Sequence, residues 1–134
     1  MRTAVIGLLL LVSGWANALT LSPMIKDELV YADLYLATHK LSNTSRNLMY
    51  YDVWVTKGEK SYDNGDAIYK SSEVLGGNSY KSITVPIMDV APDKLGVYYL
   101  CVQERPEKGK LLVVGRVCAK LRLYWPLAEL RKLQ

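Results

Sequence analysis

The sequence contains 134 residues, with 17 Lys and Arg against 13 Asp and Glu and a formal net charge of +4. The excess is small and the two signs are interspersed, so charge alone does not indicate a nucleic-acid partner. Two Cys and one His do not support a zinc site, and the spacing of the Cys is not that of a CxxC redox motif.

The first 18 residues have the pattern of a bacterial signal peptide. Arg2 provides a positive start, and Ala4 to Val12 form an apolar run. Ala16 and Ala18 supply the small residues of a cleavage site, so we expect cleavage after Ala18 and export to the periplasm. The apolar run is about half of the roughly 20 residues of a membrane-spanning helix, so we expect no membrane insertion after cleavage. An uncleaved N-terminal anchor is the alternative.

The rest of the chain is divided into short runs rich in Val, Ile, Leu, Tyr and Thr, separated by polar and Gly- or Pro-containing segments. Their spacing of roughly 8–12 residues is typical of an all-β domain. We predict one immunoglobulin-like, seven-stranded antiparallel β-sandwich over residues 19–126 and a short, weakly helical tail over residues 127–134. A closed barrel is the competing all-β fold. The predicted strands are Leu19–Ile25, Val30–Leu41, Leu48–Thr56, Ala67–Lys70, Tyr80–Ile87, Gly96–Glu104 and Leu111–Tyr124.

The last two predicted strands each contain one Cys. They are separated only by Arg105–Lys110, which contains Pro and Gly, so we expect a hairpin. Cys101 and Cys118 can then face each other, although a register offset or a bulge would be needed. An even number of Cys in an oxidising compartment usually forms a disulfide, which here would contribute on the order of 3 kcal/mol. Two buried free thiols are the alternative.

The sequence contains little that indicates catalysis or a cofactor. His39 is the only His, so a catalytic relay would have to include it, and we interpret it as an exposed or edge-of-core strand residue. The neighbours Asp27 and Glu28 would point to opposite faces of a strand, so they are not a cooperating carboxylate pair, and we interpret them as a solvated turn. Gly76 and Gly77 lack the following residues of a phosphate-binding loop. We therefore expect a binding protein, with no enzyme activity, metal or cofactor.

Three short motifs resemble those of one protein family. The sequence is similar to the N-terminal immunoglobulin-like domain of periplasmic chaperones of the chaperone–usher pilus assembly pathway. The opening strand of those domains contains an apolar-Ser-Pro-apolar stretch with a basic residue nearby, the second ends in an Asn-x-Ser turn, and the last closes with alternating basic and apolar residues before two aromatics and a Pro. The matching segments here are Leu19–Lys26, Leu41–Ser45 followed by Tyr50–Val55, and Lys120–Pro126.

The resemblance implies that the last strand binds an incomplete pilin-like subunit, or another secreted subunit, by β-strand donation. Val113 and Val117 lie on one face of that strand, and which face meets the partner is undecided. In the family, one basic residue on the first strand and one on the last anchor the carboxylate of the subunit. Lys26 and Arg122 are the matching positions, and Lys120 belongs to the same final motif. A disulfide joining the last two strands also occurs in one branch of the family, as Cys101 and Cys118 would allow. An outer-membrane usher is a second implied partner.

The length of the chain departs from the family pattern. Chaperones of this family have two domains, and this sequence ends where the first would pass into the linker. The alternative is therefore a structural or accessory envelope module, associated with a pilus but without chaperone activity. A pilin-type subunit normally has an alternating N-terminal extension, and none precedes the first strand here, which favours the chaperone-like hypothesis.

Overall fold

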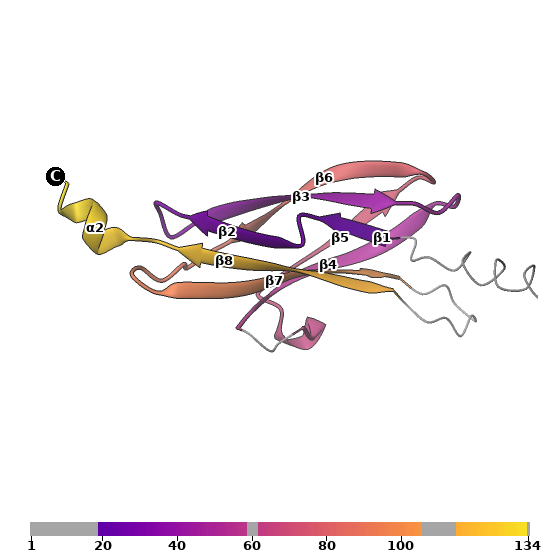
Figure 1. The fold of residues 1–134 in the computed structure, drawn as a ribbon. Helices are drawn as coiled ribbons and strands as arrows, with labels where there is room; N and C mark the ends of the chain where they lie inside the picture. The colour runs from indigo at the N-terminus through magenta and orange to yellow at the C-terminus, as the bar shows by residue number, and fades with distance from the viewer. Residues whose placement is uncertain (1–18, 59–61, 106–114, 134) are drawn as a thin grey trace, which may run out of the picture.

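The computed structural model describes residues 19–58, 62–105 and 115–133 (Figure 1). The predicted signal peptide lies outside the described residues, and its cleavage stays a prediction. The elements, in chain order, are β1 (Leu19–Ser22), β2 (Ile25–Leu29), β3 (Tyr35–Asn43), β4 (Met49–Lys57), the short 3-10 helix η2 (Asn64–Asp66), β5 (Tyr69–Leu75), β6 (Ser79–Ile87), β7 (Leu95–Glu104), β8 (Arg116–Tyr124) and α2 (Leu127–Arg131).

The strands form two sheets, one ordered β1-β3-β6 and the other β2-β8-β7-β4-β5. Figure 1 shows them as two layers, with β3 and β6 above β7 and β8. Alternate side chains of every strand except β2 point between the layers and form one core, which includes Leu41, Tyr51, Val85, Leu100 and Leu121. The predicted immunoglobulin-like β-sandwich is confirmed, and the two sheets do not close into a barrel.

The first predicted strand, Leu19–Ile25, ends early as β1 before Pro23, and a further strand, β2, begins at Ile25. Proline has no N–H to continue a ladder of hydrogen bonds, so a strand usually ends or shifts where proline occurs. β1 pairs antiparallel with β3 in one sheet, and β2 crosses to the other sheet and pairs in parallel with β8. The described residues therefore form eight strands where seven were predicted, and β2 places residues 25–29 beside the last strand.

Asn43 connects two turns at one end of the sandwich. Its side chain is buried, and Nδ2 donates to the backbone oxygens of Asn47 (2.8 Å), Gly76 (3.0 Å) and Leu75 (3.2 Å). Its Oδ1 accepts from the backbone N and the hydroxyl of Ser45. The Asn-x-Ser motif thus holds the β3–β4 turn against the β5–β6 turn.

A smaller apolar cluster lies on the outer face of the larger sheet. It consists of Trp54, Tyr99 and Cys101, with Cys118 packed against them. Tyr62, from the β4–β5 connection, packs its ring against that of Tyr99 at a centroid distance of 4.5 Å, with the ring planes tilted by 57°. The cluster fixes this connection against the strands that contain the two Cys.

The disulfide predicted between Cys101 and Cys118 is present. The two residues are direct register partners on β7 and β8, with their Cα atoms 4.1 Å apart. Such a short separation is typical of an antiparallel pair whose residues do not share backbone hydrogen bonds. The register offset or bulge that the sequence led us to expect is therefore absent.

The C-terminal helix α2 is a single short turn of five residues. Within the described ranges, no helix has the length and apolar character needed to cross a membrane.

Candidate protein-interaction site

The last strand, β8, is only partly covered by its neighbours. β7 pairs with it from Arg116 to Tyr124, but β2 pairs only from Lys120 to Tyr124. At the start of this parallel pair, the Lys120 N–H donates to the Met24 oxygen at 2.7 Å. Among the described residues, no strand forms a hydrogen-bonded pair with the β8 segment of residues 116–119 on the side away from β7, although β1 of the other sheet lies close to β8. We call this segment the free edge.

The hydrogen-bond pattern shows which backbone groups face outward at the free edge. The Glu104 N–H donates to the Gly115 oxygen, so Gly115 and the alternate residues that follow it bond to β7. The N–H and C=O groups of Arg116 and Cys118 therefore point away from β7. Those of Lys120 point the same way, and there they face the segment at the start of β2. An edge of this kind can accept another strand.

The structure also shows which face of β8 meets the core. Ala119, Leu121 and Leu123 are fully buried between the sheets, and Val117 packs half-buried at the margin of the core. The opposite face carries the polar and charged residues of the strand together with Cys118. Of the predicted partner-binding residues, Val117 is thus at the core-facing side of the free edge. Val113 falls in residues 106–114, outside the described residues.

Arg122 is held by an acidic residue of β2 on the outer face of the sheet. Its guanidinium contacts both carboxylate oxygens of Asp27, with Nη2 2.7 Å from Oδ2. The Arg122 hydrogen bond lowers the pKa of Asp27, and the same hydrogen bond raises the pKa of Arg122. The solvated turn expected at Asp27 and Glu28 is wrong, because both residues lie within β2. Pairing with β8 keeps this segment extended, and its two acidic side chains point to opposite faces as an extended segment requires.

Lys26 points to the opposite side of β2 from Asp27. It is the register partner of the buried Leu121, and its Nζ lies 3.9 Å from Glu28 and 5.9 Å from the centre of the Tyr35 ring. Lys26 and Arg122 therefore lie on different faces and do not form one joint anchor in this structure. Lys120 shares the outer face with Arg122, two residues before it.

His39 is a core residue and not the exposed or edge-of-core residue that the sequence suggested. Its side chain is 1% exposed, and neither ring nitrogen has a hydrogen-bond partner among the described residues. Burial lowers the pKa of His39 to about 4, and the positive charge of Lys26 acts in the same direction. A relay needs a nucleophile and an orienting group bonded to the imidazole, and the described residues supply neither.

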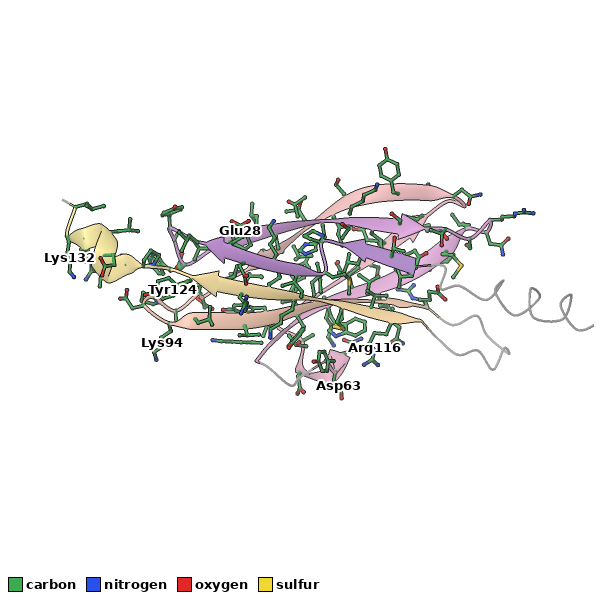
Figure 2. All side chains as sticks on the ribbon, in the orientation of Figure 1. Glu28, Asp63, Lys94, Arg116, Tyr124 and Lys132 are labelled. Carbon is green, nitrogen blue, oxygen red and sulfur yellow. A yellow bond between two sulfur atoms is a disulfide. The ribbon has the colours of Figure 1, made fainter. Side chains whose placement is uncertain are left out.

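Figure 2 shows how densely side chains fill the space between the layers, and it labels Arg116 on the side of β8 near Asp63. Arg116 lies over the Trp54 ring, with its Cζ 5.6 Å from the ring centre, and its Nε donates to Gln103 at 3.1 Å.

No group of three or more potential metal ligands occurs among residues 19–58, 62–105 and 115–133. The candidate binding site is therefore the free edge, whose outward backbone N–H and C=O groups could bind another strand, with the basic residues Lys120 and Arg122 nearby.

The sequence and the structure were compared with those of known proteins, and only solved structures match. No family model matches the sequence, and no curated protein matches it. Solved structures do match, among them the class 5 fimbriae chaperone CfaA (TM-score 0.59, 16% identity, 81% of this chain and 56% of that chain) and the E. coli chaperone DraB (0.59, 19%, 81% and 55%). A chain from a chaperone–tip adhesin complex of CFA/I fimbriae biogenesis matches with a TM-score of 0.60 and 15% identity, over 83% of this chain and 57% of that chain.

These matches confirm the resemblance at the level of the fold. This chain has the immunoglobulin-like fold found in fimbrial chaperones, and it spans just over half the length of the solved chains that it matches.

Proposed function

We propose that this protein is a periplasmic chaperone-like protein that binds a pilus subunit, or another secreted subunit, by strand pairing along the free edge of β8. The observation that carries the proposal is the free edge itself, where outward backbone groups of Arg116 and Cys118 have no strand partner among the described residues. Solved proteins of the same fold are fimbrial chaperones, which supports the same role.

In strand pairing, the backbone and the side chains make different contributions to binding. Main-chain hydrogen bonds provide affinity for an extended segment, and alternate side chains provide selectivity. Val117 lies at the half-buried margin of the core, where an apolar side chain of an added strand could contact it. Val113 has the same alternation and, in this proposal, extends the apolar row beyond Gly115.

The proposal also gives a role to three basic residues that lie on two different faces near β8. Arg122 and Lys120 lie on the outer face near the place where β2 begins, and Lys26 lies on the inner side. They would bind acidic groups of the subunit or of an outer-membrane usher. Export of the protein by residues 1–18 is part of the same proposal.

The first test is capture of the natural partner. Tagged protein recovered from periplasmic expression of the full chain would be isolated with its bound proteins, which mass spectrometry would identify. A pilin-like subunit bound at equal stoichiometry would support the proposal. A protein that elutes alone would favour the alternative of a structural or accessory envelope module without chaperone activity.

The second test isolates the backbone at the free edge. Arg116→Ala removes the side chain and keeps the outward N–H, whereas Arg116→Pro removes both, and proline is tolerated at a strand edge. Loss of one interstrand hydrogen bond should weaken subunit binding by roughly fivefold in the Pro variant relative to the Ala variant. Equal binding by the two variants would exclude strand pairing at this position. A Val113→Lys, Val117→Lys variant that retained its partner would argue against an apolar donor row.

A further inference from the structure

Glu104, one strand inside the free edge, has a carboxylate that pairs with no cation among the described residues. Glu104 is opposite Gly115 in the β7–β8 pair, and its side chain is on the core-facing side, only partly exposed. Burial raises the pKa of Glu104, and no described basic residue offsets this effect. A partly desolvated acid with no counter-ion is costly, which makes it a candidate to receive one from outside.

A second unsatisfied polar group lies beside it. Tyr51 is the register partner of Glu104 on β4, and its ring is fully buried. The Tyr51 hydroxyl has no hydrogen-bond partner among the described residues. Burial raises the pKa of Tyr51 to about 12, and the nearby charge of Glu104 adds to the effect. A neutral hydroxyl beside a carboxylate can accept a hydrogen bond from an ammonium or guanidinium group.

Gly115 leaves the Glu104 side chain open toward the free edge, whereas the Tyr51 hydroxyl is buried behind it. A strand added beside β8 would lie about 10 Å from β7, two strand spacings away, with β8 between them. Gly115 has no side chain to fill the space over Glu104, and even the Cβ of an alanine there would come to 3.7 Å from Oε1 of Glu104. A long side chain on the added strand, directed over Gly115, can span this gap, and the flexible stem of lysine is suited to it.

We propose that Glu104 and Tyr51 form a specificity site for a basic side chain, Lys or Arg, carried by the strand that pairs with β8. The inference rests on the proposed strand-binding function and adds the chemistry of one side chain of the partner. It assigns Glu104 as the acidic partner, the buried Tyr51 hydroxyl as a second polar group behind it, and Gly115 as the open position between Glu104 and the added strand.

The test uses fluorescein-labelled ten-residue peptides with alternating Val and Thr. In successive peptides one Val is replaced by Lys, by the uncharged norleucine or by Glu, and binding to the protein is measured by fluorescence anisotropy. We expect one position at which the Lys peptide binds on the order of tenfold more tightly than the norleucine peptide, with the preference falling as salt is added.

The preference should disappear in Glu104→Gln, while the norleucine peptide binds that variant as well as it binds the wild type. Tyr51→Phe keeps the buried ring and should reduce the preference in part. Glu129→Gln, on the exposed helix α2, makes the same change in net charge away from the site and should leave the preference intact. Thermal unfolding of each variant verifies that it is folded.

The two hypotheses fail in different ways. If no peptide binds, including the norleucine series, strand pairing itself is excluded and the specificity site with it. If the peptides bind but Lys gives no advantage at any position, or keeps its advantage in Glu104→Gln, the site is excluded and strand pairing stands.

Discussion

Asp27 on β2 and Arg122 on β8 are direct register partners, and the Arg122 guanidinium contacts both oxygens of the Asp27 carboxylate. This two-point contact joins the two strands on the outer face of the sheet. Arg122 is also the residue proposed to bind an acidic group of a partner. Any such group must therefore compete with Asp27, which makes Asp27 an internal substitute for the carboxylate of the partner.

Replacing Asp27 with Asn should increase the affinity of Arg122 for a partner carboxylate. The amide keeps the shape of the side chain but removes its charge, so Arg122 no longer has a competing acid. We expect tighter binding of the captured subunit in Asp27→Asn and weaker binding in Arg122→Ala, measured by surface plasmon resonance. Asp52→Asn is the matched control, because Asp52 forms a similar ion pair with Arg105 on another part of the sheet. Unchanged binding in both Asp27→Asn and Arg122→Ala would exclude a role of Arg122 in the interface.

Acid should destabilise the protein through His39. The pKa of His39 is lowered from 6.5 to about 4 in the folded state, so between these values the unfolded chain binds a proton that the folded chain does not. Stability is then complete above pH 6.5, falls as the pH decreases towards 4, and loses up to about 3 kcal/mol at lower pH. The measurement is the free energy of unfolding by urea from pH 7 to pH 3.5. In His39→Leu this part of the pH dependence should be absent; an identical profile in the two proteins would show that His39 is not the group responsible.

The sequence was sufficient for the fold class, most strand positions and the disulfide pairing. Alternation of apolar residues and turn residues at regular spacing reports which segments are strands, and both signals are local. The end of β1 before Pro23 could have been inferred, since proline interrupts a ladder. The parallel pairing of β2 with β8 could not, because it joins residues about a hundred positions apart and leaves no local pattern.

The same limit applies to the candidate site. The free edge is defined by where β2 stops along β8, and the role of Asp27 is defined by a residue on a strand at the other end of the chain. Glu104 and Tyr51 have ordinary strand positions in the sequence. Only the tertiary structure shows that, within the described part of the chain, Glu104 lacks a counter-ion and the Tyr51 hydroxyl lacks a hydrogen-bond partner. His39 alternates in phase with the buried Ala37 and Leu41, a signal that could have placed it in the core.

Removing the disulfide should lower the stability without changing the fold. Cys101 and Cys118 are 17 positions apart, and opening a loop of this length costs about 3 kcal/mol in the chain-entropy model. The double variant Cys101→Ala, Cys118→Ala should show this loss in urea unfolding, and wild-type protein treated with reductant should show a similar one. Both Cys also pack in the cluster with Trp54, so tryptophan fluorescence should report any loosening there. A loss below about 1 kcal/mol would mean that the paired strands restrict the chain almost equally without the bond.

A single methyl group at Gly77 should destabilise the protein much more than one at Gly76. A Cβ on Gly77 would lie 2.3 Å from the backbone oxygen of Arg46, whereas on Gly76 the nearest atom would be the Ser79 hydroxyl oxygen at 3.8 Å. The Arg46 backbone cannot move away freely, because the Asn78 N–H donates to the neighbouring Ser45 oxygen and holds the two turns together. We expect Gly77→Ala to cost about 2 kcal/mol or more and Gly76→Ala to change stability by less than about 1 kcal/mol, both measured by urea unfolding. Equal stabilities for the two variants would show that the β3–β4 and β5–β6 turns can separate at little cost, and that the hydrogen bonds of Asn43 do not fix their spacing.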